Sequence, residues 1–462
     1  MGATIVWLRQ DLRLADNPAL REAAALGAVI PLYILEPEIA WPAGAASRVW
    51  LHHSLSALDG SLRRQGSRLL LAVGEAAEVF QSLLRDPSIN RVFWNRRHEP
   101  SGNARDAALA QMLGAHAEVK SFPGTTLFEP GSVLTGEGRP YRVYTPFARA
   151  CLQQTPPAPP LPVPPRIDAP ARWPESQTLE ALRLLPAIDW AGGIRERWGF
   201  GEDAAHDRLE RFLTGALCAY PTGRDALADE GISGMAPHLA QGEISVRELW
   251  TLVSAARAAD PALESGATAW LRQLLWREFA YHLLHHFPHT ADRPLRPEFE
   301  RMPWIDDRPG LTAWCRGQTG YPVVDAGMRE LWATGYMHNR ARMIVASFLC
   351  KHLGIHWIEG ARWFWDTLVD ADLANNTLGW QWTAGCGADA APYFRIFNPV
   401  RQGLRFDPAG DYVRRWVPEL SSIPGKAVHT PPPGHGGYTL PICDLAVGRR
   451  QALERFDEMR AR

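Results

Sequence analysis

Lysine is almost absent from this sequence, and its charges nearly cancel. Of the 49 Lys and Arg residues only three are lysines, Lys120, Lys351 and Lys426. With 50 Asp and Glu residues, the net charge is −1. Such a balance gives no overall basic field for nucleic acid, so any DNA-binding surface has to be local. The abundant arginines suit one, because the planar guanidinium matches phosphate oxygens.

Cysteine is also scarce, and the common cofactor motifs are missing. The six cysteines lie far apart with no CxxC pair, which argues against a disulfide framework and against zinc fingers. GxGxxG does not follow the first predicted strand, and GxxxxGK[ST] is absent. Ordinary dinucleotide or P-loop binding is therefore not supported, and no metal site is expected.

Long apolar runs are lacking too. No segment approaches the length of a membrane span. The opening residues, MGATIVWLRQDLRL, have no charged leader, and Val6 stands where a myristoylation motif needs Ser or Thr. We therefore expect a cytoplasmic protein with no membrane partner.

Residues 1–130 alternate short apolar runs with helical patterns. Buried strands are predicted at Ala3–Leu8, Ala28–Leu35, Arg68–Val73 and Arg91–Trp94, and a helix over Ser47–Gln65. Continuous apolar strands alternating with helices indicate a parallel sheet covered on both faces, an α/β domain.

The chain changes character after this domain. Residues 155–174 contain nine prolines, which favours an extended connector. Beyond about residue 196 the apolar spacing is helical: a helix is expected to begin with Asp203 as N-cap, and Pro322 is expected in a first helical turn. No strand pattern follows, so the second domain is predicted to be all-helical.

Three stretches of the helical half combine aromatic and hydrogen-bonding groups. Asp372, Asn376 and Trp380 are spaced to share one helix face, although a capped helix with outward polar residues also fits. The segment Trp270–Phe279 mixes Trp, Gln and Arg in a way that suits an unstacked nucleotide, as well as a buried amphipathic helix. In Gly335–Met343, Arg340 and Arg342 point to different sides, so one can reach phosphate while the other pairs with an acid.

Together with the opening IVWLRQDLRLADNPAL, these stretches resemble the DNA photolyase and cryptochrome family along nearly the whole chain. The resemblance implies an α/β antenna domain at 1–130, a Pro-rich linker at 131–195 and a helical FAD-binding domain at 196–462. The FAD would be bent into a U shape.

The resemblance also implies roles for single residues. Asn376 matches the residue facing flavin N5, Asp370 and Asp372 an acidic pair near the flavin, and Arg342 the partner of one of them. The loop that matches the phosphate-binding segment keeps only Ser233 of the usual Thr-Ser-x-Leu-Ser. The full set of expected FAD contacts is Tyr220, Ile232, Ser233, Gly234, Met235, Ala236, Trp270, Gln273, Arg277, Asn339, Arg342, Asp370, Ala371, Asp372 and Asn376.

The resemblance also implies residues for electron transfer, for lesion binding and for DNA binding. Trp380, Trp357 and Trp304 correspond to the family's electron-hopping chain from flavin to surface. Trp276 and Trp382 match the two indoles that flank a flipped-out pyrimidine dimer, and Asn339 and Met343 match other positions of the dimer pocket. Expected DNA contacts are Arg224, Trp276, Arg340, Trp382, Arg395 and Arg405.

Gln273 departs from the pattern of enzymes that repair cyclobutane dimers, which usually have Glu there. Photolyases for (6-4) lesions have Gln, but they also need two histidines where this chain has Asn339 and Met343. The resemblance therefore favours a cyclobutane pyrimidine dimer (CPD) photolyase, a carbon–carbon lyase acting on ultraviolet-damaged DNA, over a (6-4) photolyase. We expect the Gln273 amide to replace the carboxylate.

Two rival functions stay open. Two features argue against a cryptochrome photoreceptor. Both pocket tryptophans are present, and the short stretch between Trp382 and Arg462 leaves little room for a signalling tail. A plain adenine-nucleotide-binding protein would carry no yellow chromophore.

The antenna chromophore is open as well. Residues 94–106 resemble the antenna-domain motif near the folate site, but Ser101 and Gly102 replace the usual Asn and Glu. Methenyltetrahydrofolate is favoured, with deazaflavin or an empty site as alternatives. The cysteines do not match the family's iron–sulfur branch, and a monomer is expected.

Overall fold

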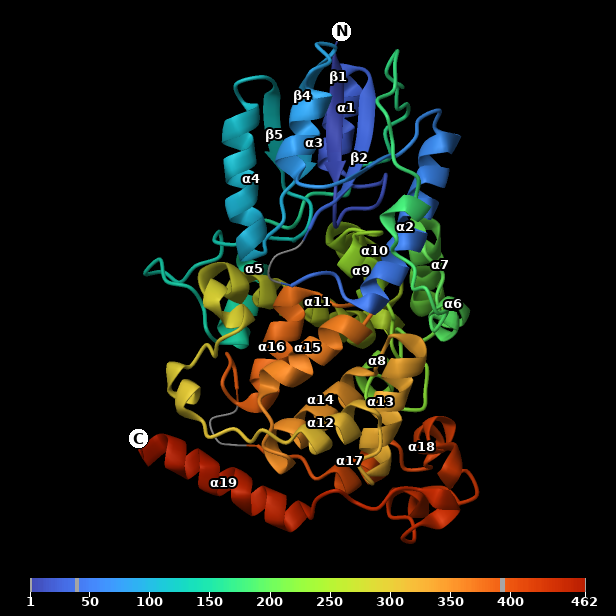
Figure 1. Cartoon of the computed structure of the whole chain (residues 1–462), viewed down its shortest axis with the longest axis vertical. Helices are drawn as coiled ribbons and strands as arrows, with labels where there is room; N and C mark the ends of the chain where they lie inside the picture. The colour runs from blue at the N-terminus through green and yellow to red at the C-terminus, as the bar shows by residue number, and fades with distance from the viewer. Residues whose placement is uncertain (1, 38–40, 391–394, 462) are drawn as a thin grey trace. The chain divides into compact units, whose positions relative to one another are not determined.

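The computed structural model describes residues 2–37, 41–390 and 395–461 (Figure 1). These residues form two compact units. Unit 1 comprises residues 1–140, 147–218 and 233–286, and unit 2 comprises residues 141–146, 219–232 and 287–462. The domain boundaries expected from the sequence stay a prediction.

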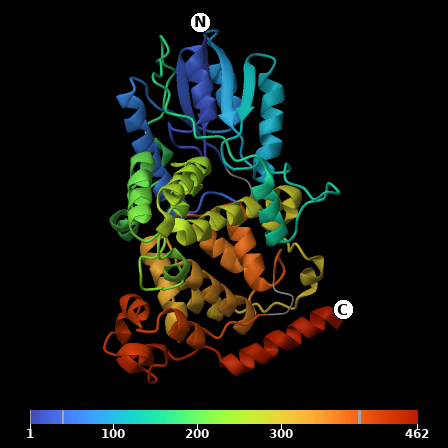
Figure 2. The ribbon, with the colours of Figure 1, turned by 180° about the vertical axis from the view of Figure 1, so that it is seen from behind.

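A five-stranded parallel sheet forms the first part of unit 1 (Figure 2). Its strands are arranged in the order β3-β2-β1-β4-β5, and their bounds are β1 Ala3–Leu8, β2 Val29–Leu35, β3 Leu70–Val73, β4 Ile89–Asn95 and β5 Glu118–Phe122. The central strand β1 and its neighbour β4 are largely buried. The predicted α/β fold is confirmed.

Helices cover both faces of this sheet. Apolar side chains of α1 (Pro18–Leu26) and α2 (Ala45–Arg64) pack into one core cluster with Val6 and Leu8. On the other face, α3 (Ala76–Leu83) and α4 (Pro100–Leu113) pack against Ile5 and Trp7. Successive residues of β1 thus serve opposite cores, which explains why the strand is buried throughout and almost entirely apolar.

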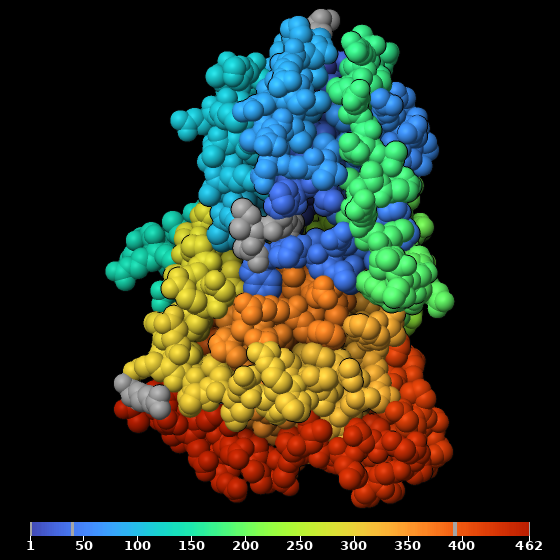
Figure 3. Space-filling model, in the orientation of Figure 1, coloured from blue at the N-terminus to red at the C-terminus, as the bar shows by residue number. Residues whose placement is uncertain are grey.

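The Pro-rich connector forms no helix or strand between residues 155 and 174. It lies on the sheet domain (Figure 3), where Val29 N donates to Asp168 O (2.8 Å). Just beyond it, Gln177 N donates to Leu71 O (2.9 Å) and Leu71 N donates to Ser176 Oγ (3.0 Å). The connector is therefore extended, as predicted, and is fixed by hydrogen bonds along its path.

The rest of unit 1 is helical. Its main helices are α7 (Gly201–Thr214), α9 (Ala236–Gln241), α10 (Val246–Ala259) and α11 (Glu264–His286). The expected start of α7 was wrong, because the helix begins at Gly201 with Phe200 as N-cap. Asp203 lies in the first turn instead, where a negative charge also stabilises the helix N-terminus.

Unit 2 contains helices and no strands in the part of the chain that the structure describes, as predicted. Helix α13 begins at Pro322, in the first-turn position expected from the sequence. The helices that matter for the site are α8 Tyr220–Gly223, α13 Pro322–Thr334, α14 Asn339–Ser347, α15 Trp357–Thr367, α16 Leu373–Ala384 and α17 Pro399–Phe406, and the last helix is α19 Leu445–Ala461. Helix α16 packs against both α14 and α15.

Candidate functional site

Helix α16 carries most of the acid, amide and indole pattern found in the sequence. Asn376 and Trp380 lie on it, one turn apart. Asp372 does not lie inside the helix, which corrects the expected helical stripe: it is the N-cap, and its carboxylate accepts from Asn375 N (2.8 Å). This satisfies an otherwise unpaired helix N–H, so Asp372 has a structural task whatever else it binds.

The Asn376 side chain is held in a fixed orientation. Its Nδ2 donates to Ala361 O on the neighbouring helix α15 (3.0 Å). No donor among the described residues contacts its carboxamide oxygen. One end of the amide is thus anchored and the other can still bind a ligand, while the flavin contact of Asn376 stays a prediction.

Arg342 and Asp370 form an ion pair in which the Asp370 side chain is buried and the Arg342 side chain is partly exposed. Arg342 Nη2 lies 2.7 Å from Asp370 Oδ2, and Arg342 Nε donates to Met337 O (2.8 Å). Burial alone would lower the pKa of Arg342, but the Asp370 carboxylate raises it above its ordinary value. Asp370 Oδ1 is buried with no hydrogen-bond partner among the described residues, so this carboxylate can still accept from a bound group.

Trp380 is buried beside other aromatic rings. Its ring centroid lies 4.9 Å from that of Phe364 and 6.1 Å from that of Trp314, both at steep angles. Its Nε1 has no hydrogen-bond partner among the described residues. Gly360 permits this placement, because a Cβ there would lie 2.0 Å from the Trp380 ring.

Two of the predicted DNA arginines of unit 2, Arg340 and Arg405, come together around Phe406. The guanidinium groups of Arg340 and Arg405 lie 4.4 and 5.0 Å from the centroid of its ring. Leu227 N donates to Phe406 O (2.9 Å), which brings the segment after α8 to the same place. That segment includes Arg224, stacked over Tyr220, so three arginines from distant parts of the sequence form one local basic cluster.

Asp225 is the acid within this cluster that sequence reasoning missed. Its carboxylate lies 2.7 Å from Arg340 Nη2. Both side chains are partly exposed, at 20% for Arg340 and 35% for Asp225. The pair holds the Arg340 side chain in place in the absence of DNA.

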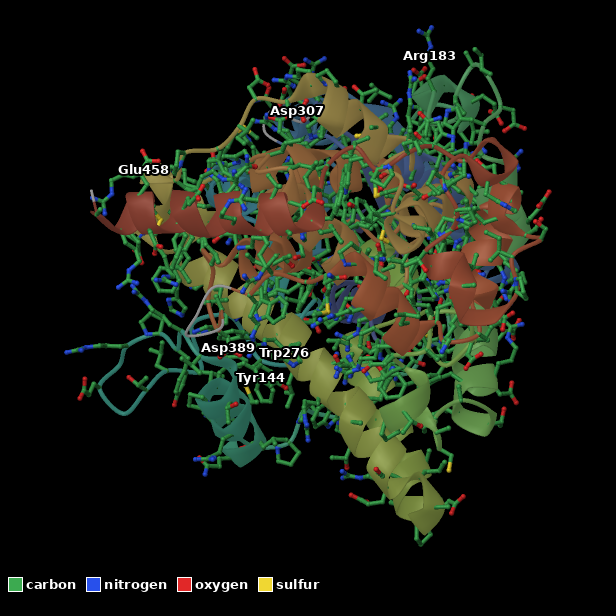
Figure 4. The ribbon with its side chains drawn as sticks, turned by 90° about the horizontal axis from the view of Figure 1, so that it is seen from below. Tyr144, Arg183, Trp276, Asp307, Asp389 and Glu458 are labelled. Atoms are coloured by element: carbon green, nitrogen blue, oxygen red, sulfur yellow. The ribbon has the colours of Figure 1, made fainter. Side chains whose placement is uncertain are left out.

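The other pocket positions of unit 2 are less constrained. Asn339 opens α14 and is exposed, and Met343 lies one turn later with its sulfur 3.5 Å from Arg340 Nη1. Trp382 is half-buried, and its Nε1 donates to the carbonyl of Asp389, labelled in Figure 4 (3.1 Å). Arg395 is exposed. Ala371 and Ile232 are half-buried, and their expected contacts to FAD stay a prediction.

In unit 1, helix α11 carries Trp270, Gln273, Trp276 and Arg277. Gln273 and Trp276 are half-buried, and Trp276 lies near the middle of the helix (Figure 4). The other two serve the unit's own packing: Trp270 is buried against Phe212, and Arg277 donates to Thr125 O (2.9 Å). These contacts give no support to a cofactor role for Trp270 or Arg277, which stays a prediction.

The loop 233–236 leads into the start of α9. Gly234 has φ +66°, a left-handed conformation that glycine adopts without strain. A Cβ on Gly234 would lie 2.3 Å from Arg208 Nη1. Sequence reasoning missed Arg208 because it lies on a different helix, α7, yet it places a cation beside the loop matched to phosphate binding.

FAD fits the chemistry of these residues. Unit 2 offers an anchored amide and a buried carboxylate oxygen with no protein partner among the described residues. No group of three or more metal-binding side chains occurs in residues 2–37, 41–390 and 395–461. Every helix in those ranges is too short or too polar to cross a bilayer.

Comparison with known proteins identifies the class. Residues 4–165 match the family model for DNA photolyase, and residues 270–458 match the model for the FAD binding domain of DNA photolyase. The chain belongs to the photolyase and cryptochrome family and contains its FAD-binding domain, which confirms the resemblance and the cofactor prediction.

Individual relatives agree along the whole chain. A deoxyribodipyrimidine photo-lyase of Agrobacterium fabrum is 47% identical and covers 98% of this chain and 97% of its own. Cryptochrome-1 of Arabidopsis thaliana is 36% identical over 99% of this chain and 70% of its own length. The structure of a class III photolyase from Agrobacterium tumefaciens superimposes with a TM-score of 0.96 at 45% identity, covering 100% of this chain and 98% of that one. The predicted enzyme class agrees with the names of these photolyases.

Proposed function

We propose that this protein is a light-driven DNA repair enzyme that uses FAD to split cyclobutane pyrimidine dimers. The observation that carries the proposal is the set of groups around α14–α16: the anchored Asn376 amide, the Arg342–Asp370 pair and the buried Trp380 ring. They supply hydrogen bonds and local charge for a flavin, and none of them is an obvious acid–base catalyst. That is the profile of a protein whose cofactor performs the chemistry.

When bound, reduced FAD supplies a photoexcited electron that opens the cyclobutane ring and then returns, so there is no net redox change. The protein's own residues would orient the flavin and hold it in place. Asn376 presents its carboxamide oxygen from a fixed position, and Arg342 holds the Asp370 side chain in an ion pair. Trp380, Trp357 and Trp304 provide indoles through which an electron can enter from outside.

Lesion recognition rests on Trp276, Trp382, Gln273, Asn339 and Met343. Extruding a dimer from the duplex costs a few kcal/mol, which stacking on flat aromatic walls partly offsets. Both indoles are half-buried, so part of each side chain remains accessible. Asn339 and Met343 occupy positions where a (6-4) photolyase needs histidines, so the cyclobutane dimer is the substrate we propose.

Arg224, Arg340 and Arg405 form the phosphate side of the DNA surface, with Arg395 as a further cation. The protein would act as a monomer in the bacterial cytoplasm, on nucleoid DNA. Methenyltetrahydrofolate remains the favoured antenna, and mass spectrometry of chromophores released from the purified protein identifies it.

Substitution of Gln273 tests the lesion contact directly. Gln273→Ala should weaken binding to a dimer-containing oligonucleotide in the dark and lower the repair yield, while Gln273→Glu should preserve both. If the alanine variant binds and repairs as the original does, Gln273 does not contact the lesion.

The second candidate is a cryptochrome-type photoreceptor, favoured by the match to Cryptochrome-1. A blue-light assay separates the two. A repair enzyme returns unmodified thymines from a dimer oligonucleotide, whereas a photoreceptor binds FAD and responds to light but leaves the dimer intact.

A further inference from the structure

The side chain of His356 lies between two tryptophans of the proposed electron-hopping chain. Its ring centroid is 5.0 Å from that of Trp304, at an interplanar angle of 58°, and 5.7 Å from that of Trp357, at a shallower 30°. Trp304 and Trp357 make no ring contact with each other in the part of the chain that the structure describes. The imidazole therefore provides aromatic contact between the two indoles.

Three local features hold this arrangement in place. His356 is the N-cap of α15, and its Nδ1 accepts from Ile358 N (3.0 Å), which fixes the ring and leaves any ring proton on Nε2. Ile305 N donates to Gly354 O (2.8 Å), so the segment that carries Trp304 is tied to the turn that carries His356. Trp357 follows as the first helical residue.

The imidazole is also uncharged in this position. Burial, with a smaller contribution from Arg362, lowers the pKa of His356 to about 4. A neutral ring adds no positive charge beside an indole that has just lost an electron, whereas a charged one would oppose that loss.

The remaining link of the chain is set by α15 itself. Gly360 lies one turn after Trp357 and is the residue against which the Trp380 ring packs. From Trp380 through α15 to His356 and Trp304, aromatic groups thus lead from a buried ring to a half-buried one.

We infer that His356 is a positioning residue of the electron-hopping chain, and that its ring couples Trp357 to Trp304. This inference rests on the proposed function. In the step concerned, one electron leaves the Trp304 indole and fills the vacancy on an oxidised Trp357, so Trp304 becomes the radical cation. No bond forms or breaks at His356. Trp304 then loses its indole proton to water, and the neutral radical takes a hydrogen atom from an external thiol, which is oxidised to a thiyl radical.

Two substitutions distinguish the role of the His356 ring in electron transfer from its role as the N-cap of α15. His356→Asn keeps a side-chain acceptor at the N-cap but removes the aromatic ring. His356→Phe keeps an aromatic ring but removes the acceptor. Both are made in the full chain loaded with FAD, with Trp304→Phe as the reference for a missing terminal donor.

The measurement is transient absorption after a short blue flash, following the decay of the Trp357 radical and the rise of the Trp304 radical. His356→Asn should melt at the original temperature but form the Trp304 radical several-fold more slowly. His356→Phe should melt lower but form that radical at close to the original rate. The inference is wrong if the asparagine variant forms the Trp304 radical as fast as the original protein. It is also wrong if the phenylalanine variant is folded but forms this radical as slowly as the asparagine variant.

Failure of the proposed function looks different. If the protein is not a repair enzyme, the unmodified chain leaves a cyclobutane dimer intact under blue light, whatever residue stands at position 356. If it has no hopping chain, the unmodified chain yields no tryptophan radical after the flash.

Discussion

At the scale of single residues, the Arg342–Asp370 pair gives the clearest prediction. The Asp370 side chain is only 3% exposed, and Arg342 is its charged partner. Arg342→Ala would leave this carboxylate buried without compensation, which costs about 3 kcal/mol of the free energy of unfolding. Urea denaturation measures the loss, and FAD retention should fall with it.

Arg342→Lys is the matched control, since it keeps the charge but not the planar fork, and it should lose less. Equal stability of the alanine variant and the original would mean that the ion pair does not stabilise the fold.

Lys351 is the second residue with a measurable signature. It is 1% exposed, donates to Ala384 O (2.7 Å), and burial lowers its pKa to about 7. The unfolded chain keeps this proton up to about pH 10. Between these values the unfolded state binds more protons, so the free energy of unfolding rises with pH.

Lys351→Met removes this dependence. The stability difference between the original and the variant should shift in favour of the original from about pH 7 to about pH 9, by at most about 1.4 kcal/mol per pH unit. Chemical denaturation at the two pH values measures it. A difference that stays constant with pH would contradict the shifted pKa.

The pair Asp225–Arg340 predicts an effect on DNA binding. Asp225→Asn frees the Arg340 guanidinium for phosphate, so dark binding of a dimer-containing duplex should tighten. The plot of log affinity against log salt concentration should become steeper, by an amount that corresponds to about one more released counterion. Fluorescence anisotropy across a salt series measures both.

Asp229→Asn is the control, because it removes the same charge from an exposed position on the same segment. If both variants bind alike, the effect is one of net charge, and the ion pair does not restrain Arg340.

At the scale of elements, the contact between α15 and α16 depends on a missing side chain. Gly360→Ala places a Cβ 2.0 Å from the Trp380 ring. Overpacking of this kind costs about 1–3 kcal/mol, and the displaced indole should also slow light-driven flavin reduction. Thermal unfolding and steady-state illumination measure the two effects.

Gly60→Ala is the matched control, since Gly60 lies inside α2 and a Cβ added there would have nothing within 4 Å. Alanine should stabilise that helix by about 0.5–1 kcal/mol. A harmless Gly360→Ala would show that the two helices can move apart.

The elements that sequence predicted well are those with a single dominant pattern. Ala3–Leu8 was found to the residue because it is apolar on both faces. Strand β5, Glu118–Phe122, was not predicted: it lies at the sheet edge, is largely exposed and contains Glu, Lys and Ser. Edge strands carry such charges and so do not show the pattern of a buried strand.

The same distinction holds for the site. Spacing along one helix was enough to single out Asn376 and Trp380. Asp225 and Phe406 contact Arg340 from distant parts of the sequence, and Arg208 reaches Gly234 from another helix. Contacts of this kind depend on the tertiary fold, so local spacing carries no signal for them.

At the scale of the whole molecule, the central claim is that light absorbed by reduced FAD drives dimer repair. The most direct test is an action spectrum of repair, recorded with the purified, reduced full chain and a duplex that contains one cyclobutane dimer. We predict repair that follows the near-ultraviolet and blue absorption of the bound flavin, together with that of any bound antenna chromophore, and none in the dark. Repair that proceeds equally in the dark, or no repair at any wavelength despite bound FAD, would contradict the claim.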